Sequence, residues 1–117
     1  GMGEANVNTR PWREAGAWHA TEVMSGKEML TGPLKLEATF WLPHPKSHYG
    51  TGRNAGKLKA TAPFYVATTP DLDKLLRAIG DAMIGIVYRD DAQIAWLNAV
   101  EVYGTPAVHI QVSELGS

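Results

Sequence analysis

The sequence contains no cysteine among its 117 residues. Disulfide scaffolds, thiolate metal sites and thiol nucleophiles are therefore excluded. Its apolar runs last only a few residues, so no segment is long enough to cross a membrane, and no apolar stretch typical of a signal peptide follows the N-terminus. Eleven Lys and Arg balance twelve Asp and Glu, so the net charge is −1 and identifies no partner. We expect a protein that acts in the cytoplasm, away from membranes.

The length of 117 residues fits a single domain, since a second core would need about another 100 residues. A chain of this size buries roughly two thirds of the surface that its unfolded state exposes, so it needs no covalent staples. Residues 1–9 have no periodic apolar pattern, and we interpret them as a disordered lead-in or a tag remnant. We therefore expect one folded domain over residues 10–117.

Apolar periodicity predicts the elements of that domain. Spacing of three and four residues predicts two helices, over residues 10–25 and 71–83. Strict alternation predicts a half-buried strand, 34–42, and a hairpin of two further strands, 92–103 and 107–114. This order is typical of an α/β (α+β) fold, a small mixed sheet with helices packed on it. The residues predicted to form the core are Trp12, Leu36, Phe40, Leu75, Ile79, Ile94, Val100 and Val108.

The segment between residues 43 and 69 is irregular and basic. No acidic residue occurs between Glu37 and Asp71. A connection of this length in a small domain is usually functional or disordered. The absence of acids favours a segment that holds a polyanion, through four cations: Lys46, Arg53, Lys57 and Lys59. The alternative is a solvated surface loop that happens to be basic.

Two glycine patterns in this segment fail as nucleotide-binding motifs. Residues 51–57 resemble a phosphate-binding loop, but Thr51 stands where the first Gly belongs. Leu58 replaces the Ser or Thr that binds magnesium, and no helical pattern follows. The glycines of residues 50–56 miss the dinucleotide fingerprint by one position and lack a βαβ context.

Two histidines, His44 and His48, lie four residues apart. Pro43 and Pro45 exclude an α-helix there, so the spacing does not place both imidazoles on one helix face. With no cysteine and no nearby acid, ordinary surface histidines are favoured over a zinc site.

The acidic residues around the second helix are stronger candidates. Each pair has a plain structural explanation, because Asp is favoured at helix N-termini and Asp-Asp is common in turns. Asp71, still non-helical, and Asp73, in the first turn, could nevertheless converge, and Asp91 could supply a third carboxylate from a neighbouring strand. Magnesium takes such carboxylates together with water and phosphate oxygens. Arg77, four residues after Asp73, could hold a phosphate. This set suits phosphodiester hydrolysis.

The same residues carry a family resemblance. Residues 70–78, PDLDKLLRA, followed by 81–83, DAM, and 87–93, VYRDDAQ, resemble the signature of the RusA family of Holliday junction resolvases. Residues 43–54, PHPKSHYGTGRN, resemble phage and prophage members of that family. The resemblance covers roughly residues 10–115, and a DLD helix start followed about eighteen residues later by DDAQ is a specific combination.

The resemblance implies a magnesium-dependent homodimeric endonuclease, with manganese as a possible substitute, that cuts four-way DNA junctions symmetrically. The family's catalytic, metal-binding carboxylates fall on Asp71, Asp73 and Asp91, and its helix-borne basic residue, often Lys, falls on Arg77. Arg keeps the charge that binds phosphate but cannot give up a proton at neutral pH. Lys74, at a position often held by Asn, joins the DNA-binding set with the four cations of the basic segment.

One departure from the family concerns the N-terminus. Members usually begin with an extra strand and a short Gly/Lys/Arg segment, and residues 1–9 carry neither signal. We therefore expect a sheet that lacks an edge strand or borrows one from a partner.

Two alternative functions stand beside the endonuclease. The first is an N-terminally truncated, weakly active or inactive relative that binds branched DNA. The second is a small dimeric interaction module whose acids are only caps and turns.

Overall fold

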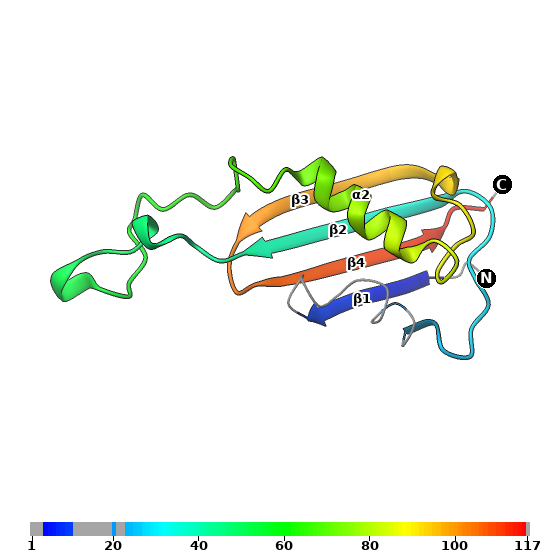
Figure 1. Ribbon diagram of the computed structural model, residues 1–117, viewed down its shortest axis with the longest axis horizontal. Coiled ribbons are helices and arrows are strands. Elements are labelled where there is room, and N and C mark those ends of the chain that lie inside the picture. The colour runs from blue at the N-terminus through cyan, green and yellow to red at the C-terminus, as the bar shows by residue number, and fades with distance from the viewer. Residues whose placement is uncertain (1–3, 11–19, 21–22, 117) are drawn as a thin grey trace.

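The computed structural model describes residues 4–10, 20 and 23–116. One mixed sheet with a helix on one face forms the body, and a long arm projects from one end, so that the molecule measures 56 × 24 × 23 Å (Figure 1). In these residues, no helix is long and apolar enough to cross a membrane. The regular elements are β1 (Glu4–Arg10), β2 (Leu34–Leu42), α2 (Leu72–Met83), β3 (Ile94–Tyr103) and β4 (Ala107–Glu114), with three 3-10 turns, η1 (Lys46–His48), η2 (Gly52–Asn54) and η3 (Asp91–Gln93).

The predicted hairpin of the last two strands is wrong. The strand order is β1-β4-β2-β3, and β2 lies between β3 and β4, parallel to the first and antiparallel to the second. The link 104–106 therefore passes over the end of β2, where the Gly104 N–H donates a 2.8 Å hydrogen bond to the Leu42 carbonyl. A Cβ on Gly104 would lie 2.9 Å from Cδ1 of Trp41, so any larger residue would force the Trp41 ring to shift.

The interpretation of residues 1–9 as a lead-in without structure is wrong for residues 4–9. Residues 4–10 form β1, which pairs antiparallel with β4, for example Ala5 with Val112 and Val7 with Ile110. Only two apolar residues occur in this strand, which is too few for a periodic signal. Pairing with β4 decides its conformation, and the edge position that the sequence analysis expected to be missing is filled.

The N-terminal helix predicted over residues 10–25 falls largely outside the described residues. Within the described part, Ala20, Val23 and Met24 are helical, whereas Arg10 ends β1. Trp12, predicted to be in the core, also lies outside the described residues.

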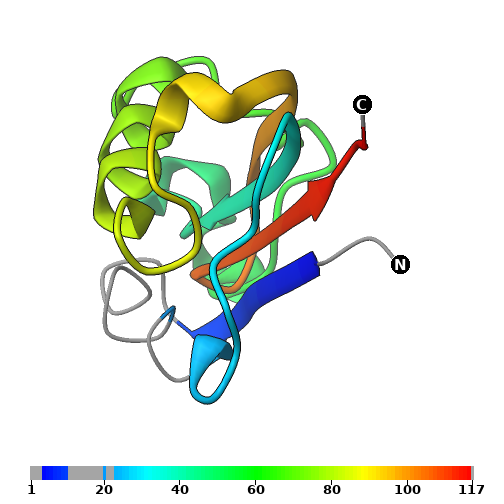
Figure 2. The same cartoon turned by 90° about the vertical axis from the view of Figure 1, so that its right-hand side faces the viewer.

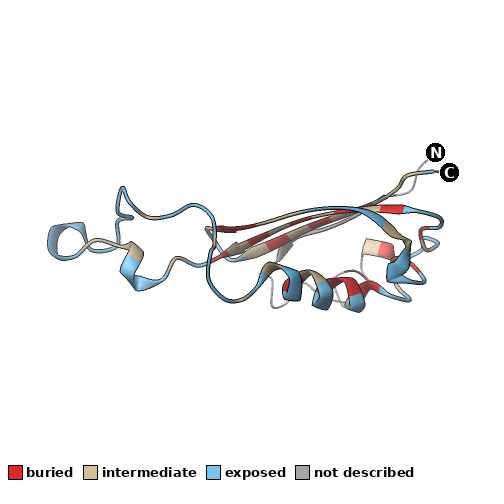
Figure 3. Ribbon diagram, turned by 90° about the horizontal axis from the view of Figure 1, so that it is seen from above, coloured by how far each residue is buried: buried red, intermediate tan, exposed pale blue. Residues whose placement is uncertain are grey.

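The core lies between α2 and one face of the sheet (Figure 3). β2 alternates between buried and half-buried residues along its whole length, as predicted. Viewed along the long axis, α2 covers the β3 side of the sheet, and β1 lies at the opposite edge (Figure 2). The predicted core residues that are confirmed are Leu36, Phe40, Leu75, Ile79 and Val108, and Ile94 packs partly buried against them.

Val100 is the predicted core residue that the structure places elsewhere. The pairing of β2 with β3 shifts by one residue between Leu34 and Lys35. Phe40, on the core face of β2, is paired with Glu101, and Val100 is paired with Thr39 on the open face. Because strand side chains alternate with period two, a shift of one residue exchanges the two faces. In β3 the predicted faces are therefore correct at Ile94, before the shift, and exchanged for the residues after it.

The helix α2 forms as its sequence predicts. Its apolar stripe buries Leu75, Ile79 and Met83 against the sheet, and the polar residues between them face solvent. Asp71 stands at the N-cap position with extended backbone. The helix ends before Gly85, whose φ of 83° suits a residue without Cβ.

Candidate functional site

The Asp71 carboxylate marks the start of α2, but it does not cap the helix. Its side chain makes no capping hydrogen bond, although its backbone carbonyl accepts 3.1 Å hydrogen bonds from the N–H groups of Lys74 and Leu75. Lys74 Nζ lies 3.7 Å from Asp71 Oδ2, and both side chains are largely exposed to solvent. The capping hydrogen bond that usually accounts for an Asp at this position is therefore absent, and the carboxylate is open to solvent.

Glu101 is a functional candidate that the sequence analysis missed. It lies on the core face of β3, where only 6% of its surface is exposed. Within the described part of the chain, its Oε2 atom is buried and has no hydrogen-bond partner. Burial raises the pKa of the Glu101 carboxyl, and the negative charge of Asp71 raises it further. Two residues further along the paired strands, Leu42 and Tyr103 line one pocket with Pro70, so Glu101 lies in the part of β3 near the start of α2.

No sequence signal identified Glu101. The predicted core residues of this strand, Ile94 and Val100, are even-numbered, so strict alternation left Glu101 among the outward, solvated positions. The one-residue shift in pairing with β2 turns it inward instead. A buried acid of this kind is visible only once the strand register is known.

Asp91 does not join Asp71 and Asp73. It lies in η3 before β3. Burial, followed by the negative charges of Asp91 and Asp81, raises the pKa of Tyr88 to about 12. The Tyr88 hydroxyl donates a 2.6 Å hydrogen bond to the carbonyl of Gly80, near the C-terminal end of α2. In residues 4–10, 20 and 23–116, no three acidic or histidine side chains gather into a group that could hold a metal ion. One subunit therefore does not form the predicted group of three carboxylates.

The DDAQ sequence that carries Asp91 has a structural task of its own. Asp90 accepts a 2.9 Å hydrogen bond from the Ala92 N–H, and the Gln93 side chain accepts one of 2.9 Å from the Asp90 N–H. Gln93 Nε2 also donates to the carbonyl of Gly32, at 3.1 Å. These bonds form a capping box at η3 and tie the start of β3 to the turn before β2.

Arg77 lies on the exposed side of α2, four residues after Asp73. Residues four apart lie on one helix face, so its guanidinium and the Asp73 carboxylate share that face. With Lys74 beside Asp71, the first two turns of α2 present both charges that a metal–phosphate site requires.

The basic segment forms the arm that projects beyond the sheet (Figure 1). Backbone hydrogen bonds of 2.9 Å close its two sides, from Gly50 N–H to the Lys57 carbonyl and from Lys59 N–H to the His48 carbonyl. The four predicted DNA-binding cations are all exposed: Lys46, Arg53, Lys57 and Lys59. The arm leaves the body after β2 and rejoins it at residues 64–66, which bond to the end of β3. Pro70 lines a pocket with residues at the base of the arm, so this base adjoins the start of α2.

The two histidines at the base of the arm come together, contrary to the expectation from the flanking prolines. The turn η1 brings the Nδ1 atoms of His44 and His48 to 3.0 Å. The Tyr103 ring stacks on His44, with ring centroids 5.0 Å apart and an interplanar angle of 22°. The prolines exclude an α-helix, but they permit a 3-10 turn that gives the same proximity.

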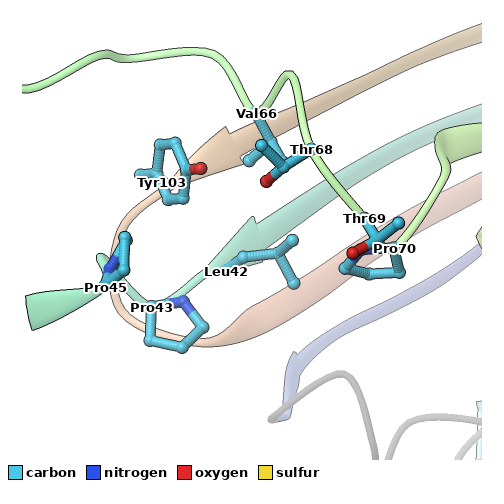
Figure 4. Close-up of a pocket in the computed structure, with 8 residues that line it drawn as sticks. All are labelled: Leu42, Pro43, Pro45, Val66, Thr68, Thr69, Pro70 and Tyr103. Carbon is cyan, nitrogen blue, oxygen red and sulfur yellow. The ribbon is translucent and has the colours of Figure 1, made fainter. Parts of the chain in front are cut away.

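A pocket of about 270 Å³ opens between the end of the sheet and the segment that leads into α2 (Figure 4). Its walls are mainly apolar, with hydroxyl groups from Thr68, Thr69 and Tyr103. Pro70 lines this pocket, and Asp71 follows Pro70 directly in the sequence. The pocket could therefore hold a sugar or base ring next to the candidate site. Its other walls are Leu42, Pro43, Pro45 and Val66.

Comparison with known proteins agrees with the motifs. Residues 5–113 match the family described as endodeoxyribonuclease RusA. The chain belongs to the RusA family. A relative of this RusA-family chain is the uncharacterized protein YqaN of Bacillus subtilis (strain 168), which is 29% identical over 91 residues. The aligned part covers 76% of the RusA-family chain and 63% of YqaN, so the chain spans less than two thirds of that relative's length.

Proposed function

We propose that this RusA-family protein is a divalent-cation-dependent endonuclease that hydrolyses phosphodiester bonds in four-way DNA junctions. The observation that carries the proposal is the uncapped Asp71 carboxylate at the start of α2, in a chain that matches an endodeoxyribonuclease family over residues 5–113. A carboxylate that the helix does not use, beside a phosphate-binding cation such as Arg77, suits metal-assisted hydrolysis.

The residues present suit a hard cation such as Mg²⁺ or Mn²⁺. Besides Asp71, the first turn of α2 carries Asp73, and the unpartnered Oε2 atom of Glu101 offers a further oxygen in the same region. Mg²⁺ binds through one or two carboxylates, with water and substrate phosphate oxygens completing its shell. When bound, the ion would offset developing negative charge and increase the acidity of a water molecule. We assign Asp71 to bind it directly and Asp73 to bind it through a water molecule of its shell.

Arg77 has a separate task in this proposal. Its guanidinium keeps a positive charge at all relevant pH values, so it holds the scissile phosphate but does not deliver a proton. Lys74, adjacent to Asp71, adds a second positive charge on the approach of the DNA backbone. Proton transfer to the leaving oxygen then falls to water.

The arm supplies the affinity for DNA in this proposal. Its cations are exposed, and no acid occurs between Glu37 and Asp71 to oppose them. Neutralisation of phosphates by Lys and Arg releases counterions and provides most sequence-independent affinity. Because the base of the arm adjoins Asp71, a strand held along the arm reaches the site. The pocket of Figure 4 takes the sugar or base that flanks the cut phosphate.

A homodimer is part of the proposal, because a four-way junction offers two equivalent strands and a twofold enzyme matches that symmetry. The edge of β3 is the favoured interface. Trp96 and Leu97 are each 54% exposed, and residues 94–100 carry no charge that would oppose pairing. After residue 100, the outer edge of β3 already pairs with the segment that returns from the arm. The Val66 N–H donates to the Glu101 carbonyl, and the Tyr103 N–H donates to the Phe64 carbonyl.

Antiparallel pairing of β3 with β3 of a second copy would have a specific consequence for Asp91. The strand start of one copy would lie next to the strand end of the other. Asp91 of one copy would thereby approach Asp71 and Glu101 of the other. The separation of these residues within one subunit supports an arrangement in which each site uses both copies.

The decisive experiment is cleavage of a synthetic four-way junction by the purified chain with and without Mg²⁺. We expect paired nicks near the branch point that require the cation and disappear in Asp71→Asn. A linear duplex of the same sequence serves as the control substrate. Binding of the junction without any nicking would instead support the branched-DNA-binding alternative, and neither binding nor nicking would support the interaction module.

A further inference from the structure

Glu101 is a buried acid whose surroundings leave it unsatisfied. It lies on the core face of β3, paired in register with Phe40, and is 6% exposed. Its Oε2 atom has no hydrogen-bond partner among the described residues. Nearly all buried polar groups in folded proteins have such partners, and an unsatisfied one destabilises the native state. A ligand that bonds to the free oxygen would remove this destabilisation.

The position of Glu101 indicates what that occupant is. Glu101 is paired with Phe40, and two residues further on Tyr103 and Leu42 line a pocket with Pro70. Pro70 immediately precedes Asp71, so the Asp71 carboxylate approaches this region from a different element, the start of α2. Lys74 contacts Asp71 at 3.7 Å, but its side chain is 79% exposed and no ion pair joins it to Glu101 in the described residues. Two carboxyl groups that approach from a strand and from a helix, with one oxygen unmet, are suited to a cation between them.

We infer that Glu101 is a metal ligand, contributed by β3 to a two-carboxylate cation site whose other ligand is Asp71. The inference deepens the proposed function and rests on it. A site with two carboxylates leaves the remaining positions of Mg²⁺ to water and phosphate oxygens. It also explains how one subunit can bind a cation although Asp91 lies at the other end of α2.

The competing explanation is that Glu101 is a neutral, purely structural carboxyl group that never meets a cation. The two explanations differ in what happens when the acid is replaced by its amide. Gln has nearly the same shape and no charge, so a structural role survives the change. A metal ligand does not survive it, because an amide oxygen binds Mg²⁺ or Mn²⁺ more weakly than a carboxylate does.

The test is a titration of the full chain with Mn²⁺ alone, without DNA, followed by electron paramagnetic resonance of the free ion. We expect one site per chain in the wild type and a loss of affinity of about tenfold or more in both Glu101→Gln and Asp71→Asn. Glu37→Gln is the matched control, because Glu37 lies in the same sheet on its open face, 3.2 Å from Lys35. It should bind Mn²⁺ with wild-type affinity.

Thermal unfolding with and without Mn²⁺ gives a second readout and verifies folding of each variant. The midpoint of the wild type and of Glu37→Gln should rise with the ion, since a ligand that binds only the native state stabilises it. The unfolding midpoint of Glu101→Gln should be the same with and without the ion. Wild-type Mn²⁺ affinity in Glu101→Gln, or no Mn²⁺ binding by the wild type at millimolar ion, would overturn the inference.

The outcome separates the inference from the proposed function. If Glu101→Gln binds Mn²⁺ and cuts junctions like the wild type while Asp71→Asn does neither, the assignment of Glu101 fails and the nuclease stands. If the wild type binds Mn²⁺ through Glu101 but cuts no junction, the cation site stands and the proposed substrate is wrong.

Discussion

Asp71 and Asp91 lie at opposite ends of α2. Asp71 is the N-cap of the helix, whereas Asp91 acts on Tyr88, whose hydroxyl is bonded to Gly80 near the helix C-terminus. A helix of twelve residues is about 18 Å long, so one cation cannot bridge the two carboxylates within a subunit. Asp91 can therefore share a cation with Asp71 only if the two residues come from different copies of the chain.

The first prediction is complementation between two inactive variants. Asp71→Asn and Asp91→Asn should each abolish junction nicking, because each removes a carboxylate from both sites of the dimer. If the sites combine residues of two copies, a mixed dimer carries both substitutions in one site and none in the other. An equimolar, re-equilibrated mixture should therefore nick at about a quarter of the wild-type rate. A mixture as inactive as its components, or a fully active Asp91→Asn, would contradict the shared site.

The second prediction concerns the β3 edge. Leu97→Lys should convert the protein to a monomer, because two lysines would face each other near the twofold axis of the paired strands. Its free energy of unfolding should change little, since Leu97 is 54% exposed. Light scattering measures the mass. Leu58→Lys, in the arm and 50% exposed, is the control and should stay dimeric. A dimeric Leu97→Lys would exclude this edge as the interface.

The third prediction concerns the arm and salt. In an Asp71→Asn background that does not cut, the affinity for a four-way junction should fall steeply as salt rises. Each replacement of an arm cation by Ala should flatten the slope of log K against log salt by about one unit. The replacements are made at Lys46, Arg53, Lys57 and Lys59, and Lys27→Ala, an exposed lysine outside the arm, is the control. A quadruple variant with the wild-type slope would show that the arm is only a solvated surface.

The fourth prediction is an alkaline limit to stability set by Tyr88. Its pKa is raised from 10.0 to about 12, so the native state holds this proton more tightly than the unfolded state does. The resulting stability is fully present below pH 10 and is lost as pH rises towards 12. Tyr88→Phe should remove this dependence and should cost about 1–2 kcal/mol at pH 7, because the Gly80 carbonyl loses its donor.

Denaturant unfolding between pH 7 and 12 checks the fourth prediction. Tyr65→Phe is the matched control, because the Tyr65 side chain is 65% exposed and should leave both the stability and its pH dependence unchanged. If the alkaline loss of stability persists in Tyr88→Phe, another titrating group causes it and the prediction is wrong.

The sequence by itself determined the elements whose pattern is local. The alternation of residues 34–42 predicted β2 with its correct bounds, and the apolar stripe after Asp71 predicted α2. The basic arm and the motifs of the RusA family were likewise readable residue by residue. These features depend on neighbours along the chain, which periodicity and charge record directly.

The tertiary structure decided everything that depends on which segments meet. It placed β2 between β3 and β4 instead of joining those two in a hairpin, and it recruited residues 4–10 as β1. The one-residue shift in the pairing of β2 with β3 turned Glu101 into the core. The length of α2 kept Asp71 and Asp91 apart. Strand partners and register are set by long-range packing and backbone pairing, so the same alternating pattern fits either face until the neighbouring strand is known.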